Sequence, residues 1–230
     1  MKYIPLFSLL ALFLLTQPLT NARAESWFLP SETVPSRIQV DGTSNVRDWD
    51  VATEDVQGRL HLSKDGFWTD TGLDVEHLPL SADAGLSFVV EIPASSVKSD
   101  NRRFNSNLHD YMNVEKHKQI RFAFKSLEVK AEEKEDADPN QIETQVTGEL
   151  SLAGVTQTIT FPVTWIRKDQ TLVLKGEVAF KMSLFDIDPP RMMMGALRTA
   201  DEVQVAFSWV LEPGENPEKV SETAQGEARR

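Results

Sequence analysis

Hydrophobic and polar residues alternate along most of the chain between residues 38 and 209. Apolar side chains at every second position are typical of half-buried antiparallel strands, which place one face against a core and the other against water. The apolar face of about eight such runs begins at Ile38, Val56, Leu86, Ile120, Val146, Ile159, Leu172 and Val203. The pattern therefore predicts an all-β chain, with residues 46–51 as a further or continuing strand.

Short turn signals separate these runs. They are the pairs Asp41-Gly42, Asp65-Gly66, Ala153-Gly154 and Lys168-Asp169. Glycine and aspartate permit the tight backbone geometry of turns. Because Ala153-Gly154 stands between two strongly alternating runs, we expect a tight β-hairpin there.

Residues 93–114 interrupt the alternation and show helical spacing instead. The apolar residues of this segment fall at positions i, i+4, i+7 and i+8, and they are Phe104, Leu108, Tyr111 and Met112. Ser99 or Asp100 can cap the start of a helix. The segment predicts a short helix near residues 100–113 that lies across the strands.

The first 24 residues have the features of a cleaved signal peptide. Lys2 is followed by the short apolar stretch 4–15, and Ala22-Arg23-Ala24 is a small-residue cleavage site. This apolar stretch is too short to span about 30 Å of hydrocarbon. We therefore expect an exported protein that begins at Glu25 and does not span the membrane.

The mature chain divides into three parts. Residues 25–35 are expected to be an irregular N-terminal arm, and residues 36–211 a single strand-rich domain. Residues 131–141 form a charged loop or a long hairpin tip. Residues 212–230 have almost no large apolar side chains and are expected to be a disordered tail.

Composition narrows the possible partners and the compartment. The formal net charge is −11, and loss of the leader with Lys2 and Arg23 makes it more negative. Such a charge argues against nucleic acid or an anionic membrane surface as a partner, since both are polyanions. An exported chain without cysteine fits the bacterial periplasm better than a secretory route in which small domains depend on disulfides.

The sequence shows no constellation typical of catalysis. His109 and His117 lie eight positions apart, which is not a usual spacing of metal ligands, and the Asp and Glu residues between them fit a solvated helix face. Nucleophile and phosphate-binding motifs are absent as well. We expect no metal, no cofactor and no enzymatic activity.

Three stretches together resemble the YceI-like family of exported bacterial proteins. They are NLHDYMNVEKHKQIRFAF (107–124), GELSLAGVTQTITFPV (148–163) and the segment from Phe180 to Trp209. The resemblance covers residues 36–210, and the Gly-Val-Thr turn with its downstream Pro-Val is its most specific part. At residues 42–51 the chain reads GTSNVRDWDV, where the family usually carries a His-Ser pair.

This resemblance implies an eight-stranded, antiparallel, lipocalin-like barrel with a short lid helix. It also implies a lumen that holds a long-chain isoprenoid or fatty amphiphile. On that basis the large apolar side chains of the strands, the helix and the methionine run 192–194 are expected to line the lumen. The expected lining residues are Phe88, Val90, Leu108, Tyr111, Met112, Phe122, Phe124, Phe161, Trp165, Phe180, Met192 and Met193.

Two functions remain open at this point. One is a periplasmic carrier of an amphiphilic lipid, with a hydrophobic small molecule as its partner, present as a monomer or homodimer. The other is a structural or stress-response interaction module, in which the same side chains fill the barrel at interior density.

Overall fold

The computed structural model describes residues 25–62, 68–69, 72–73, 81–130, 138–192 and 196–217. The expected signal peptide (1–24) therefore lies outside the described residues, as do the Asp65-Gly66 turn, loop residues 131–137, Met193 and the chain beyond residue 217.

Strands make up most of the described chain. They are β1 (Ser26–Pro30), β2 (Arg37–Ser44), β3 (Trp49–Thr53), β4 (Gln57–Leu62), β5 (Trp68–Thr69), β6 (Gly72–Leu73), β7 (Leu86–Pro93), β8 (Gln119–Val129), β9 (Gln141–Leu152), β10 (Val155–Lys168), β11 (Thr171–Lys181), β12 (Arg191–Met192) and β13 (Leu197–Gly214). The helical elements are η1 (Ala94–Ser96), α1 (Arg102–Tyr111) and η2 (Met182–Phe185), of which η1 and η2 are 3₁₀ turns.

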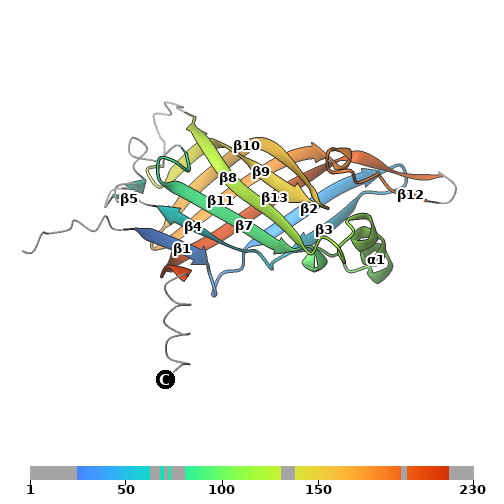
Figure 1. The fold of residues 1–230 in the computed structure, drawn as a ribbon, viewed down its shortest axis with the longest axis horizontal. Coiled ribbons are helices and arrows are strands. Elements are labelled where there is room, and N and C mark those ends of the chain that lie inside the picture. The colour runs from blue at the N-terminus through green and yellow to red at the C-terminus, as the bar shows by residue number, and fades with distance from the viewer. Residues whose placement is uncertain are drawn as a thin grey trace, which may run out of the picture.

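Eight antiparallel strands close into a barrel (Figure 1). Around the barrel their order is β1, β4, β7, β8, β9, β10, β11 and β13, and pairing of β1 with β13 completes the ring. The predicted all-β, lipocalin-like barrel with one short helix is confirmed. Closure satisfies the backbone groups that an open sheet would leave at its two edges.

The long strand β13 also carries the additional pair β2–β3. Its residues 199–208 pair with β2, whereas its residues 211–214 pair with β1. β1 and β2 thus follow each other along the same side of β13. Ala52 of β3 exchanges backbone hydrogen bonds with Lys98, which ties this pair to the segment after β7. The further or continuing strand predicted at 46–51 is present in part, since β3 begins at Trp49 and ends at Thr53.

Strand residues extend beyond both ends of the predicted domain 36–211. The arm 25–35 contains β1, and the tail expected from residue 212 begins with the last three residues of β13. These two segments pair with each other from Trp27↔Gly214 to Pro30↔Leu211. Barrel closure depends on this pairing, and neither segment shows enough alternation to reveal it.

Helix α1 is shorter than expected and has a different cap. Asn101, and not Ser99 or Asp100, precedes the first turn and accepts hydrogen bonds from the backbone N–H groups of Arg103 (3.0 Å) and Phe104 (3.1 Å). This arrangement satisfies two of the free donors at the helix start.

The turn predictions had mixed outcomes. Ala153 and Gly154 both have positive φ, at 51° and 89°, and join β9 to β10 in the tight hairpin that was predicted. Asp169 turns β10 into β11, also as predicted. Asp41-Gly42 was wrong as a turn, since it lies within β2. The Trp49 indole occupies the place where a side chain at Gly42 would lie.

Candidate functional site

The interior of the barrel is densely packed at the end that carries β1. Five large side chains at this end are 0% exposed: Leu60, Leu86, Trp165, Leu172 and Leu211. The pairing of neighbouring strands brings these residues together, because Leu60 lies opposite Phe28 of β1 and Leu172 lies opposite Leu211 of β13. This half of the barrel is therefore a filled core.

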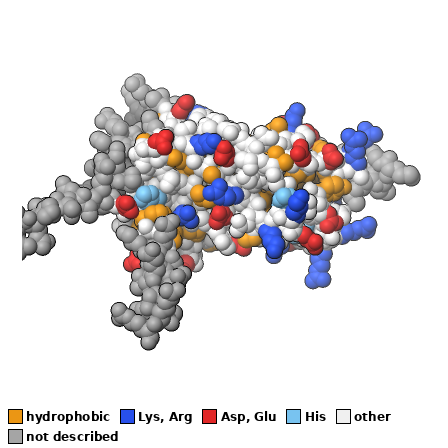
Figure 2. Space-filling model, in the orientation of Figure 1, with side chains coloured by type: hydrophobic (Ala, Val, Ile, Leu, Met, Phe, Trp, Pro, Cys, Tyr) orange, Lys and Arg blue, Asp and Glu red, His pale blue; other side chains and the backbone are white. Residues whose placement is uncertain are grey.

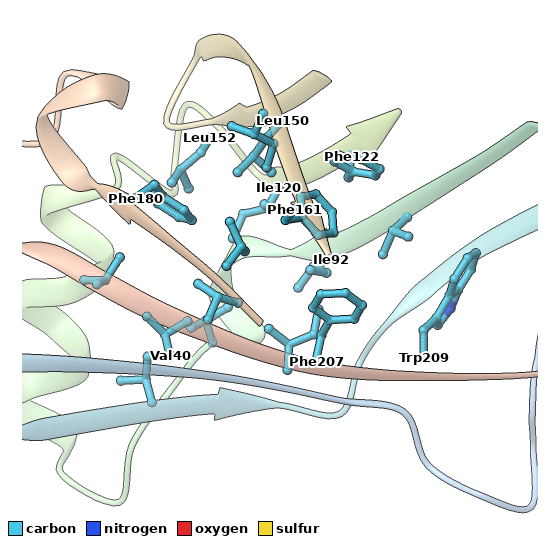
Figure 3. A pocket seen from close by; sticks show the side chains of 18 of the residues that line it. Val40, Ile92, Ile120, Phe122, Leu150, Leu152, Phe161, Phe180, Phe207 and Trp209 are labelled. Atoms are coloured by element: carbon cyan, nitrogen blue, oxygen red, sulfur yellow. The ribbon is translucent and has the colours of Figure 1, made fainter. Parts of the chain in front are cut away.

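The other half of the barrel, toward α1, contains a cavity of about 210 Å³. Every residue that lines it is apolar. We call it the lumen cavity. Figure 3 shows its lining side chains turned inward from strands all around the barrel, and those labelled are Val40, Ile92, Ile120, Phe122, Leu150, Leu152, Phe161, Phe180, Phe207 and Trp209.

Burial changes along the barrel axis in agreement with this cavity. Phe122, Leu150 and Phe207 line the lumen cavity and remain partly accessible, although they point into the barrel. Trp165 and Leu172, which also point inward but lie in the packed half, are fully buried. The barrel is therefore hollow at one end and filled at the other.

A second cavity, of about 250 Å³, adjoins the first at the α1 end. Four residues line both cavities: Trp49, Leu108, Met182 and Ile187. We call the second one the mouth cavity. It lies between α1, the β2–β3 loop and the segment from η2 to β13, and the Trp49 and Phe104 rings, 5.6 Å apart, join β3 to the helix there.

The mouth cavity has a mixed lining, unlike the lumen cavity. Apolar side chains such as Val46 and Tyr111 lie beside polar and basic ones. The polar and basic lining residues are Ser44, Arg47, Asn101, Arg103, Asn107 and Thr199. The two cavities thus place a wholly apolar interior next to a cavity with a mixed polar and apolar lining.

Seven of the twelve residues expected to line the lumen do line the lumen cavity. They are Phe88, Val90, Leu108, Met112, Phe122, Phe161 and Phe180. Their contact with a ligand stays a prediction. Leu108 and Met112 come from the end of α1, which confirms that the helix covers this end of the barrel.

Phe124, Trp165 and Tyr111 lie elsewhere, and these placements correct the expectation. Phe124 stacks on Phe88 with ring centroids 4.7 Å apart and belongs to the packed core. Trp165 is also in that core, where its indole N–H donates to Thr144 Oγ1 at 2.9 Å. Tyr111 is 39% exposed and lines the mouth cavity. Alternation shows which face points inward, but not how far along the axis the packed half extends.

The methionine run gives no test of its predicted role. Met192 belongs to β12, although its side chain is not described, and Met193 lies outside the described residues.

Sequence reasoning omitted several lining residues that it could have included. They continue the apolar faces of predicted strands and are Ile38, Val40, Leu150, Leu152, Ile159, Val178, Val203, Val205, Phe207 and Trp209. Met182 and Ile187 gave no such signal, because they belong to η2 and the turn after it.

The histidines near α1 have structural contacts. His109 Nε2 lies 2.9 Å from the carbonyl oxygen of Val97, and the His117 ring packs over Gly154 in the β9–β10 turn. Within the described ranges, no three His, Asp or Glu side chains are grouped as metal ligands would be. Nor does any helix in this part of the chain have the length and apolar character needed to cross a membrane.

One carboxylate at the cavity end has a shifted pKa. Asp201 accepts hydrogen bonds from the hydroxyl and the backbone N–H of Ser183, at 2.6 and 2.9 Å. These bonds, with a smaller contribution from Lys181, lower the pKa of Asp201 below its ordinary value of 3.8. The ionised side chain thereby holds η2 against β13.

Comparison with solved structures agrees with the barrel fold. BcnA of Burkholderia cenocepacia is 20% identical, with a TM-score of 0.57 over 76% of this chain and 95% of its own. A domain from Saccharophagus degradans described as polyisoprenoid binding, and implicated in plant cell wall breakdown, is 12% identical. Its TM-score is 0.56 over 83% of this chain and 100% of its own. At these identities the likeness shows the fold alone.

Comparison with sequences identifies the family. No curated protein matches the chain. The family model of the YceI-like domain, however, matches residues 33–211, which cover α1, the walls of both cavities and the barrel strands except β1 and the last three residues of β13. The chain therefore belongs to the YceI-like family.

Proposed function

We propose that the protein binds and carries a long-chain amphiphilic lipid, of the polyisoprenoid or fatty type, in the bacterial periplasm. The observation that carries this proposal is the wholly apolar lumen cavity inside a closed barrel. Each methylene group that moves from water into such a site contributes about 0.8 kcal/mol. A long apolar tail could thus bind firmly with few polar contacts.

Two further observations support the proposal. The chain belongs to the YceI-like family, and a structural neighbour is described as a polyisoprenoid-binding domain. The periplasmic location rests on the leader 1–24 and on the absence of cysteine.

The competing function is an interaction module with a filled barrel. The partial accessibility of Phe122, Leu150 and Phe207 speaks against it, because side chains that fill a core are buried. A dry apolar cavity of about 150 Å³ in another protein is sufficient to admit benzene. The lumen cavity, at about 210 Å³, is larger than that.

Native mass spectrometry and solvent extraction of the purified protein test this proposal. We expect a hydrophobic ligand to co-purify with the wild type. Val178→Phe places a larger side chain in the lumen cavity and should lower ligand occupancy several-fold. Val34→Phe is the matched control, since Val34 is 50% exposed and lines neither cavity.

Two outcomes would count against a carrier. One is a folded wild-type protein that has no ligand and takes up none when incubated with lipid extracts. The other is equal occupancy in the wild type and Val178→Phe, which would place the ligand outside the lumen.

A further inference from the structure

We propose that the mouth cavity recognises an anionic headgroup, a phosphate or a carboxylate, of the lipid whose tail lies in the lumen cavity. This inference rests on the proposed function and specifies the ligand's chemistry. It is carried by Arg47 and Arg103, which line the mouth cavity from the β2–β3 loop and from α1.

The two cavities share part of their walls, and this arrangement suggests the orientation of the ligand. Trp49 and Leu108 are among the residues that line both, so a molecule with its apolar tail in the lumen cavity would have its other end next to the mouth cavity. All the residues that line the lumen cavity are aliphatic or aromatic or are methionine, and the two polar atoms in their side chains are the buried indole nitrogens of Trp49 and Trp209, whereas several polar side chains line the mouth. A headgroup buried in the lumen would lose its hydrogen bonds, which is costly.

The mouth favours a negative charge over a neutral or positive group. No Asp or Glu is among its lining residues. In the described part of the chain, neither Arg47 nor Arg103 forms an ion pair. Two guanidinium groups without a carboxylate partner can each donate charge-assisted hydrogen bonds to the oxygens of a phosphate or carboxylate.

Hydrogen bonds hold the backbone that carries each arginine. Ser44 Oγ accepts from the backbone N–H of Arg47 and donates to its carbonyl, at 3.1 and 2.6 Å. Asn45 fastens the same loop to β13 through the backbone N–H of Arg198, at 2.8 Å. Arg103 lies in the capped first turn of α1. Fixed backbones lower the entropy lost when the two side chains close on a ligand.

The overall charge of the protein does not account for a preference for anions at the mouth. A chain with a net charge of −11 repels anions at long range. Figure 2 shows basic side chains projecting, among acidic ones, from the end of the molecule that carries α1. An affinity for anionic lipids would therefore come from particular side chains at the mouth and not from the field of the whole protein.

Binding of tail-matched probes tests the inference. The probes are a long-chain fatty acid with its fatty alcohol, and an isoprenyl phosphate with its isoprenol, measured by displacement of a fluorescent fatty probe. We expect each anion to bind the wild type at least about tenfold more tightly than its alcohol, a difference that corresponds to about 1.4 kcal/mol. The ratio of anion affinity to alcohol affinity, compared between the two pairs, distinguishes a phosphate from a carboxylate headgroup.

Substitution of the arginines locates the effect. In the double variant Arg47→Gln with Arg103→Gln, the preference for each anion should fall to about twofold or less, while affinity for the alcohols stays unchanged. The double variant Arg121→Gln with Lys125→Gln removes the same two positive charges from the outer wall, where Arg121 pairs with Glu91 and Lys125 pairs with Glu149. This control should keep the full preference.

Three results would overturn the inference. Equal binding of anions and alcohols by the wild type overturns the headgroup site and leaves the carrier function standing. An equal loss in Arg121→Gln with Lys125→Gln shows general electrostatics instead of a site at the mouth. Failure of all four probes to bind overturns both proposals.

Discussion

At the scale of single residues, the alternation of apolar and polar positions predicted well which side chains point into the barrel. It predicted poorly where along the barrel axis each of them lies. Phe122 and Phe124 belong to the same predicted face and both point into the barrel, yet only Phe122 lines the lumen cavity. Their difference arises from contacts distant in sequence, such as the stacking of Phe124 on Phe88. Gly42 is a similar case, because its strand position depends on the Trp49 ring that packs against it.

Phe124→Asp should abolish cooperative folding, whereas His117→Ala should change stability by less than about 1 kcal/mol. Phe124 is 7% exposed within the packed core, where an unpaired carboxylate costs several kcal/mol. His117 covers the β9–β10 turn from outside that core. Thermal melts of both variants check this expectation, and equal losses would contradict it.

At the scale of elements, local signals were reliable where local geometry decides the structure. The Ala153-Gly154 turn was predicted because the pair stands between two strongly alternating runs, and its two positive φ angles in the structure suit a two-residue hairpin. The lid helix was predicted from its apolar spacing, although its cap was assigned wrongly. β1 was missed because its five residues become a strand only by pairing with β4 and β13.

Gly154→Ala should destabilise the protein by about 1–2 kcal/mol, because φ of 89° disfavours any residue with a Cβ. A Cβ would also meet the His117 ring. Chemical denaturation of Gly154→Ala alone and in a His117→Ala background separates the two causes. We expect most of the loss to persist in the double variant, and its disappearance would identify the ring contact as the cause.

Asp201→Asn should weaken the attachment of η2 in a pH-dependent manner. Because the folded pKa of Asp201 lies below 3.8, its contribution is present above that value and is lost as pH falls through the lowered folded pKa. The wild type should therefore exceed Asp201→Asn in stability at neutral pH, and the difference should shrink at strongly acidic pH.

Asp50→Asn, which removes an exposed carboxylate of β3, is the control for this effect. An NMR titration of the Asp201 carboxyl group provides the direct measurement. A midpoint at or above 3.8 would contradict the role assigned to the Ser183 hydrogen bonds.

At the scale of the whole molecule, the barrel class was predictable and its uneven filling was not. Repeated alternation predicted about eight antiparallel strands, and the family resemblance supplied their closure into a barrel. The division into a packed half and a hollow half depends on which inward side chains meet across the axis. Which side chains meet is determined by strand pairings between distant parts of the chain, such as the pairing of β1 with β13.

The mouth shows the same limit of sequence reasoning. Arg47 and Arg103 are 56 positions apart, and the folded barrel places both around one cavity. The negative net charge gave no sign of this feature, because a total charge does not describe a local arrangement.

The most direct test of a hollow, ligand-binding barrel is a crystal structure of the protein with a fatty acid that carries bromine at the end of its tail. Anomalous scattering would locate the bromine. We predict a peak within the lumen cavity, among Phe122, Leu150 and Phe207. A bromine found only on the outer surface, with aromatic rings closing the lumen throughout, would contradict the account.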